Sequence, residues 1–408
     1  MRMRALIGYL SGSVCLFVVG CTAGVTPNSS PPVTPISSLP VTVPSPGVAA
    51  WGDSMTQGNK GQFDVNNYPA QLGAMLTIPV VNEGISGNTS TQIGVREGGV
   101  PAYATVQGGV IPASGSVEVT FPTGYEPVTS VGPTAGTPGN ILGVHGVVTY
   151  DSASSGYVFT RSTAGSAVSA SAPAQFVVDT PYANYLPVFW EGRNNYGAPP
   201  QIISDLKAQI ATVPPGQDYL VLSITNNERT TEWKGGSGYD VIVKDNQEMQ
   251  ALAGSHYLDI REILINSYDP TQANDVSDYN KDEVPTSLRA IPAEFTLASA
   301  VGPSDTTVYT TPGTPFGLGG NAVIAVDTGV NAEDMNITAV TVCDRNSSLP
   351  QCTNHLNQDI FTVQRGFEGN QTAHAAGAVV VGIDTVHLNG KGTGIVAQAI
   401  ATYLSSYK

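Results

Sequence analysis

Two long stretches of this chain, residues 99–184 and 291–380, are rich in Gly, Thr, Ser and Val and show turn signals but no helical period. They separate three segments in which short apolar runs alternate with helical apolar spacing, at 48–98, 185–290 and 381–408. Strands that alternate with helices predict a parallel sheet covered by helices. We therefore expect an α/β core in three parts that carries two β-rich insertions.

The expected core elements are short. The helices include one at 68–76, one opened by Pro199 and Pro200, and one at the C-terminus that bears Val396 and Ile400 on one face. The apolar runs expected to form strands are 48–51, 79–81, 187–190, 219–224, 256–260 and 379–383.

The N-terminus predicts export. Residues 1–20 carry two arginines followed by an apolar stretch that is too short to span a membrane stably, as in a signal peptide. The sequence Val18-Val19-Gly20-Cys21 resembles the lipobox of bacterial lipoproteins, in which Cys21 becomes lipidated. Residues 21–47 then form a Pro-, Ser- and Thr-rich tether. The alternative is an ordinary secretory signal cut a few residues later. We expect a lipid-anchored protein of the bacterial cell envelope, or else a secreted one.

The charge of the chain excludes some partners. Lys and Arg number 17 against 32 Asp and Glu, which gives a net charge of -15. Such a surface repels phosphate backbones and anionic lipid headgroups. We expect no nucleic-acid partner, and membrane contact only through the lipid anchor.

Cysteine usage agrees with export. Cys15 leaves with the signal peptide and Cys21 takes the lipid, so Cys343 and Cys352 remain and are expected to form a disulfide bond in an oxidising compartment. His355 completes a Cys-x-x-His pattern that also suits a metal, but two further ligands at suitable spacing are missing. No metal site is therefore expected.

A candidate nucleophile follows the first strand. A serine hydrolase needs a hydroxyl activated by an imidazole, a carboxylate that holds the imidazole, and N–H donors for the oxyanion. Gly52-Asp53-Ser54-Met55-Thr56 lies where a strand-to-helix turn presents Ser54 at the carboxyl edge of the sheet. The alternative for Ser54 alone is a helix cap.

Three further polar blocks follow in a fixed order. The second follows the second strand, the third follows the next core strand, and the fourth precedes the last helix. The blocks are Asn82-Glu83-Gly84-Ile85-Ser86-Gly87-Asn88-Thr89, Glu191-Gly192-Arg193-Asn194-Asn195 and Asp384-Thr385-Val386-His387.

This order of blocks resembles the SGNH, or GDSL-like, hydrolase superfamily. The resemblance implies a flavodoxin-like three-layer fold with a parallel sheet, and a catalytic triad of Ser54, Asp384 and His387 without a cofactor. It also implies an oxyanion hole formed by the backbone N–H groups of Ser54 and Gly87 and by the side chain of Asn194. The third block of the family usually reads Gly-x-Asn-Asp, and Asn195 replaces the Asp here, which leaves Asn194 and Asn195 both open as the donor.

Each of these residues also has a bland interpretation. Gly87 suits an oxyanion donor because a side chain there would obstruct close backbone approach, but it also suits a plain turn. Asp384 reaches the ring of His387 only if the segment curls, and otherwise caps a turn. In similar SGNH proteins a segment like 284–289 runs almost directly into the fourth block, so the second insertion appears to separate the two in this chain.

The remaining histidines are expected to be structural. His145 lies in the first β-rich stretch, His256 begins a strand, and His355 adjoins the two cysteines. His374 belongs to a pattern that begins at Arg365 and resembles a small β repeat common in phage tail fibres.

The resulting hypothesis is an exported serine esterase that removes O-acetyl groups from a glycan. The alternatives are a lipase or general carboxylesterase, and a non-catalytic surface protein that binds glycans on a hydrolase scaffold. Trp190, Tyr196 and Trp233 are candidates for stacking on sugars, although ordinary packing is an equal alternative for each.

Overall fold

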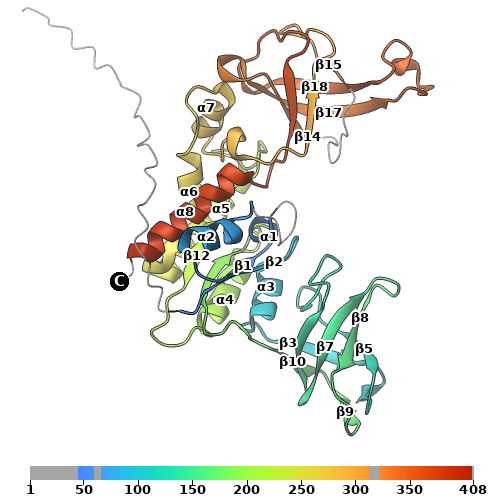
Figure 1. Ribbon diagram of the computed structural model, residues 1–408, viewed down its shortest axis with the longest axis vertical. Helices are drawn as coiled ribbons and strands as arrows, with labels where there is room; N and C mark the ends of the chain where they lie inside the picture. Colours follow the sequence, from blue (N-terminus) through green and yellow to red (C-terminus); the bar gives the residue numbers. More distant parts are fainter. Residues whose placement is uncertain (1–44, 59–65, 312–321, 407–408) are drawn as a thin grey trace, which may run out of the picture. The chain divides into compact units, whose positions relative to one another are not determined.

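The computed structural model describes residues 45–58, 66–311 and 322–406 (Figure 1). The expected signal peptide at 1–20, Cys21 and most of the tether at 21–47 lie outside the described residues. Within the described ranges, no helix combines the length and the apolar character needed to cross a membrane.

A parallel sheet of five strands forms the centre of the α/β core, as the sequence predicts. Its strand order is β2-β1-β11-β12-β13, and every pair of neighbours is parallel. The three inner strands, β1, β11 and β12, are buried along their whole length, which explains why they are nearly continuous apolar runs. The strands are β1 (Val48–Gly52), β2 (Val80–Gly84), β11 (Leu186–Trp190), β12 (Leu220–Leu222) and β13 (Tyr257–Leu258).

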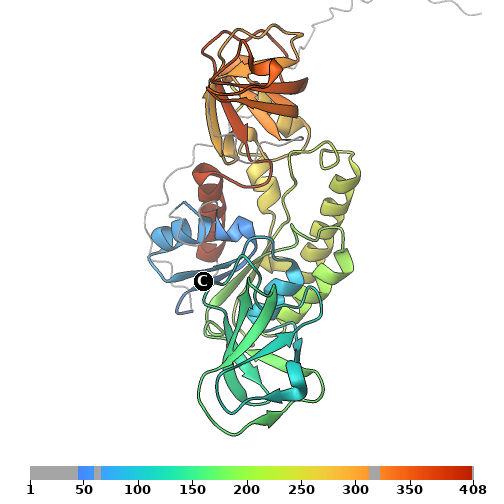
Figure 2. The same cartoon turned by 90° about the vertical axis from the view of Figure 1, so that its right-hand side faces the viewer.

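Helices cover both faces of this sheet (Figure 2). Val48 and Ala50 point to the face that packs against α2, α6 and α8, whereas Ala49 and Trp51 point to the face that packs against α3, α4 and α5. The helices of the first face are α2 (Tyr68–Leu76), α6 (Ile260–Ile265) and α8 (Gly390–Ser406), and those of the second are α3 (Ser90–Glu97), α4 (Pro199–Ile210) and α5 (Ser237–Ala253).

The helix α5 was not expected from the sequence. Its buried face includes the polar residues Asp245 and Asn246, which interrupt the apolar period. The Asn246 side chain bonds to both the N–H and the carbonyl oxygen of Ile224, at 2.8 and 2.9 Å. Backbone groups beyond the end of β12 therefore compensate the burial of the Asn246 amide. The periodicity of the helix does not indicate this contact.

The first β-rich stretch forms a closed antiparallel barrel with the order β10-β3-β5-β8-β7-β6. Its interior is filled by apolar side chains that include Ile141, Phe159 and Phe176. Two shorter strands, β4 (Val110–Ile111) and β9 (Val168–Ser169), pair with each other. The barrel strands are β3 (Ala102–Val106), β5 (Ser116–Thr120), β6 (Thr137–Ile141), β7 (Val144–Asp151), β8 (Gly156–Arg161) and β10 (Ala174–Val178).

The second β-rich stretch forms a six-stranded antiparallel sheet with the order β14-β19-β16-β17-β18-β15. Its apolar core includes Phe295, Ile324, Met335 and Phe361. The strands are β14 (Ala293–Thr296), β15 (Thr307–Thr310), β16 (Val323–Val326), β17 (Glu333–Cys343), β18 (Gln358–Gly369) and β19 (Val379–Ile383).

The position of β19 differs from the expectation. Residues 379–383 do form a strand, but it pairs antiparallel with β14 and β16 instead of joining the parallel sheet. An apolar run fixes the strand but not its partner, because both kinds of sheet accept Val and Ile. The α/β part of the C-terminal segment is therefore the helix α8 and the loop before it.

Candidate active site

The first block forms the turn between β1 and the short helix α1 (Ser54–Gln57). Asp53, which is buried, caps this helix by accepting a hydrogen bond from the N–H of Met55 at 2.9 Å. The capping role that the sequence left open for Ser54 therefore belongs to Asp53. Ser54 itself is the first residue of the helix and is half-buried.

The second block is fastened to the first. Ile85 donates its N–H to the carbonyl oxygen of Gly52 at 3.0 Å, and Ser86 donates its N–H to Oε1 of Gln57 at 3.0 Å. Gly87 follows with φ +76°, a value that residues with a side chain disfavour and glycine adopts readily. A Cβ built on Gly87 meets no atom of the described residues within 4 Å. The backbone conformation, and not crowding by this chain, therefore explains the glycine.

The third block places two asparagines differently. The Asn194 side chain donates to Oδ2 of Asp53 at 3.2 Å and to the carbonyl oxygen of Asn88 at 2.9 Å, so it joins the first three blocks. The Asn195 side chain instead bonds to Ser90, with its Nδ2 on the hydroxyl at 2.9 Å and its Oδ1 on the N–H at 3.1 Å. Asn194 faces the Ser54 turn, whereas Asn195 anchors the start of α3.

The fourth block curls as a triad requires. Oδ2 of Asp384 lies 2.8 Å from Nδ1 of His387, and Oδ1 accepts the N–H groups of Val386 and His387, each at 2.9 Å. Asp384 therefore caps a turn and also holds the imidazole of His387. The sequence left these two roles open as alternatives, and Asp384 has both. The side chains of Asp384 and His387 are 30% and 28% exposed, which leaves the pair accessible to solvent.

The pKa values of these groups reflect their contacts. Burial alone would raise the pKa of Asp384, but the hydrogen bond and charge of His387 and two backbone N–H groups lower it to about 2. Burial alone would lower the pKa of His387, but Asp384 and then the charge of Asp53 raise it. Burial raises the pKa of Asp53 to about 6, although the Met55 N–H and the charges of His387 and Arg193 oppose the shift.

Two observations place the fourth block beside the first. The charges of Asp53 and His387 act on each other's pKa. Met55 and Leu388, the neighbours of Ser54 and His387 in sequence, belong to one apolar core.

The backbone of Ala290 forms two hydrogen bonds with the loop of His387. The Ala290 N–H donates to the carbonyl oxygen of His387, and its own carbonyl oxygen accepts the N–H of Asp384, each at 2.9 Å. The segment that precedes the second β-rich stretch thus meets the fourth block that follows it.

The topology of the sheet explains why these loops converge. The neighbouring strands β1 and β11 lead in opposite directions across the sheet, because the chain passes from β1 to β2 on one side of this pair and from β11 to β12 on the other. The gap beyond the carboxyl ends of two such neighbouring strands is where open α/β sheets bind ligands. Ser54 follows β1 and Asn194 follows β11, so both lie at this point.

The other histidines have packing or hydrogen-bonding partners. His256 stacks on Tyr219 with 4.2 Å between ring centroids, and His374 is buried with its two nitrogens 3.1 Å from Asp327 and 3.0 Å from Glu333. These contacts agree with the expected structural roles.

His145 lies within a second Ser-His-Asp set on the barrel. Its Nδ1 is 3.0 Å from the Ser162 hydroxyl and its Nε2 is 2.9 Å from Asp179. The His145 side chain is 48% exposed, and the set lies on antiparallel strands and their loops instead of a strand-to-helix turn.

The three aromatic candidates for sugar stacking have separate environments. Trp190 is buried, packs edge-on against Tyr68 and donates to the carbonyl oxygen of Ser223, so it is a core residue. The Tyr196 ring lies under the guanidinium of Arg193 at 4.7 Å.

Trp233 packs with Phe367 at 4.7 Å between ring centroids and lies under the ammonium of Lys281 at 3.5 Å. Packing therefore accounts for Trp190, whereas Tyr196 and Trp233 are partly exposed.

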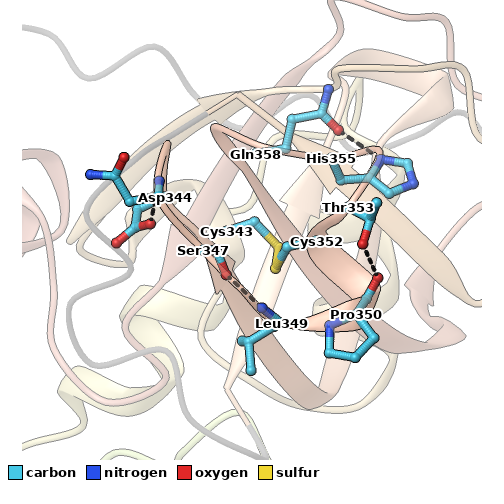
Figure 3. The surroundings of a disulfide bond; sticks show 10 residues. Cys343, Asp344, Ser347, Leu349, Pro350, Cys352, Thr353, His355 and Gln358 are labelled. Carbon is cyan, nitrogen blue, oxygen red and sulfur yellow. Dashed lines mark hydrogen bonds between the residues drawn. A yellow bond between two sulfur atoms is a disulfide. The ribbon is translucent and has the colours of Figure 1, made fainter.

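Cys343 and Cys352 form a disulfide bond, which confirms the expected pairing (Figure 3). Cys343 ends β17, and Cys352 lies in the turn that leads to β18. His355 stacks on Tyr309 at 4.0 Å, and its Nδ1 lies 3.1 Å from Oε1 of Gln358. The one thiol of the Cys-x-x-His pattern, that of Cys352, is thus used by the disulfide.

Comparison with known proteins adds no relative: no protein-family model, curated protein or solved structure matches this chain.

Proposed function

We propose that this protein is a serine esterase of the SGNH type, in which Ser54 is the nucleophile and His387 the general base. The observation that carries the proposal is the 2.8 Å contact between Asp384 and His387 on a loop beside the Ser54 turn. When the five parallel strands are numbered by their order along the chain, the sheet order β2-β1-β11-β12-β13 becomes 2-1-3-4-5, the order of flavodoxin-like folds. Helices on both faces make three layers, and both features support an SGNH-type fold.

The reaction would proceed through an acyl-enzyme. The Ser54 oxygen attacks the ester carbonyl carbon while its proton passes to Nε2 of His387, and the oxyanion forms opposite the N–H groups of Ser54 and Gly87 and the amide of Asn194. Collapse breaks the bond to the alcohol, which takes the proton from His387. Water then repeats these steps on the acyl group and releases the acid.

The substrate we propose is an O-acetyl group on a glycan. The side chains of His387 and Asp384 are partly exposed, which suits a substrate that reaches the site from a large polymer, because such a substrate cannot enter a closed pocket. A profile of turnover across acetyl, butyryl and long-chain esters tests the acyl group. Faster turnover of long chains would indicate a lipase or general carboxylesterase instead.

The nucleophile is tested with a fluorophosphonate probe that labels activated serines, followed by peptide mapping. We expect the label on Ser54, and we expect Ser54→Ala and His387→Ala to lose both labelling and acetyl-ester turnover. Unchanged circular dichroism of the variants shows that folding is intact.

Ser162→Ala is the matched control, because Ser162 also lies in a Ser-His-Asp set but on the barrel surface. It should retain full turnover. Activity that survives Ser54→Ala and disappears in Ser162→Ala would reassign the site. A wild-type protein that neither reacts with the probe nor hydrolyses any ester in the profile would indicate a non-catalytic glycan-binding protein.

A further inference from the structure

A cluster of charged side chains that takes no part in the proposed mechanism is buried beside the fourth block, where Glu228 and Arg289 both donate to the carbonyl oxygen of Thr385. Its carboxylates come from the α/β core and from the second β-rich sheet, and its two cations come from the core. Each carboxylate is at most 2% exposed. The cluster consists of the carboxylates Glu228, Asp278, Glu283, Asp334 and Glu368 and the cations Lys281 and Arg289.

The carboxylates converge closely. One oxygen from each of Glu228, Asp334 and Glu368 lies within 4.8 Å of the other two, and the same holds for Asp278, Glu283 and Glu368. Two ligands of one calcium ion, at about 2.4 Å each, lie at most about 4.8 Å apart. Five carboxylates against two cations leave a formal charge of -3 when all are ionised, so the two cations do not neutralise the buried cluster.

Glu228 supplies an observation that is independent of this convergence. Its side chain is 1% exposed, and neither of its oxygens accepts a hydrogen bond from any residue that the structure describes. Its contact with Arg289 is an ion pair at 3.4 Å. A buried carboxylate without hydrogen bonds is costly unless another group compensates its charge. The Glu228 carboxylate thus points into the cluster with free lone pairs.

Asp334 and Glu368, which converge with Glu228, accept hydrogen bonds from residues around the cluster. Asp334 accepts hydrogen bonds from Asn274 at 3.0 Å and from Thr286 at 2.7 Å. Oε1 of Glu368 accepts from Lys281 at 2.6 Å, whereas its Oε2 accepts no N–H or hydroxyl group of the described residues, and the carboxyl groups of Glu368 and Asp278 interact with each other. Outer hydrogen bonds that orient carboxylates in this way are typical of metal sites.

We propose that Glu228, Asp334 and Glu368 bind a calcium ion. Carboxylate oxygens select hard cations such as calcium and magnesium over softer metals. Calcium fits better than magnesium because calcium accepts bidentate carboxylates in flexible geometry, whereas magnesium demands a near-ideal octahedron and retains several water ligands. The proposal is independent of the esterase activity.

The ion would link two parts of the chain. Glu228 follows β12 of the parallel sheet, whereas Asp334 lies on β17 and Glu368 on β18 of the antiparallel sheet. The Glu228 N–H also donates to the carbonyl oxygen of Thr385 at 3.0 Å, next to Asp384. Calcium would therefore stabilise the attachment of the second sheet and the loop of the fourth block.

The test uses the purified full-length protein. Elemental analysis of protein prepared without chelators should find about one calcium ion per chain, and thermal unfolding should occur several degrees higher in millimolar calcium chloride than in EDTA, because the ion binds the folded state. Glu228→Gln, which keeps the shape of the side chain but removes its charge, should weaken calcium binding about tenfold or more and abolish the difference in Tm.

Asp245→Asn is the matched control. Asp245 is also buried without a hydrogen bond from the described residues, but it belongs to neither group of converging carboxylates. This variant should retain the calcium response. The proposal is overturned if the wild-type protein contains no calcium and has the same Tm in calcium and in EDTA. It is also overturned if Glu228→Gln binds calcium like the wild type, or if this variant raises Tm while calcium has no effect, since bound protons would then compensate the cluster.

Discussion

The side-chain amide of Asn194 donates a hydrogen bond to the carboxylate of Asp53, at 3.2 Å between Nδ2 and Oδ2. Its second hydrogen is used by the carbonyl oxygen of Asn88 at 2.9 Å. Both amide hydrogens are thus occupied before a substrate binds. To donate to an oxyanion, Asn194 must exchange one of these bonds, and the longer bond to Asp53 is the one we expect it to release.

The first prediction separates Asn194 from Asn195. Asn194→Ala should lower kcat by roughly 10² to 10³, as removal of an oxyanion donor does, with a small change in KM. Asn195→Ala should leave kcat near the wild-type value but lower Tm, because its two bonds anchor Ser90. Steady-state kinetics and thermal unfolding of both variants make the comparison. The opposite pattern would make Asn195 the donor.

The second prediction concerns pH. In the proposed mechanism His387 acts as the neutral base, so kcat/KM should rise as pH increases through the pKa of His387. Because Asp384 and Asp53 raise this pKa, the midpoint of the acidic limb should lie above the ordinary 6.5. Asp384→Asn removes the larger of these two charge effects, so the midpoint should move to lower pH. The rate should fall by about 10²- to 10⁴-fold, because the amide favours the wrong tautomer of the imidazole.

A pH series of kcat/KM for both proteins checks this sign. Asp53→Asn should move the midpoint in the same direction by a smaller amount, since Asp53 acts on His387 through charge alone. An acidic limb that does not move in Asp384→Asn would show that another group titrates, and the role of His387 as base would be withdrawn.

The sequence predicted the parts of this fold that depend on local patterns. The apolar runs that became β1, β2 and β11 and the Pro-initiated helix α4 are recognisable because their period and their turn residues lie within the element. The partner of β19 could not be predicted, since it depends on strands far away in the chain. The helix α5 was missed because its buried Asn246 is compensated by Ile224, outside the helix.

The candidate site follows the same rule. Gly87, Asn194 and His387 belong to blocks that occur in a fixed order, so the sequence predicted which loops form the candidate site. The fold brings those loops together. The contacts of Asp53 with the site were not predicted: it caps α1, accepts from Asn194 and raises the pKa of His387. Its place in the Gly-Asp-Ser block was the available signal, but its contacts depend on tertiary structure.

The third prediction addresses Cys21, which lies outside the described residues. Cys21→Ser should release the protein from membranes into the soluble fraction, because a lipid on this residue is the anchor that the sequence predicts. Fractionation of cells that produce each form measures the change. Mass spectrometry of the mature N-terminus is the independent check, and an unmodified start downstream of Cys21 would establish an ordinary secretory signal.

The last prediction concerns the disulfide between Cys343 and Cys352, which closes the turn between β17 and β18. Cross-linking a loop of this size should stabilise the folded state by about 2 to 3 kcal/mol, largely by restricting the unfolded chain. Replacing both cysteines with serine should therefore increase hydrogen exchange in this hairpin under mild heating. Hydrolysis of a small acetyl ester should stay near the wild-type rate, because Ser54 and Asn194 lie at the parallel sheet, whereas turnover of a polymeric acetylated glycan should fall more.

A loss of small-ester activity as large as the loss on the glycan would instead show that the hairpin supports the His387 loop. Two free thiols in the native protein would show that Cys343 and Cys352 form no disulfide bond, and the stabilisation argued from it would not apply.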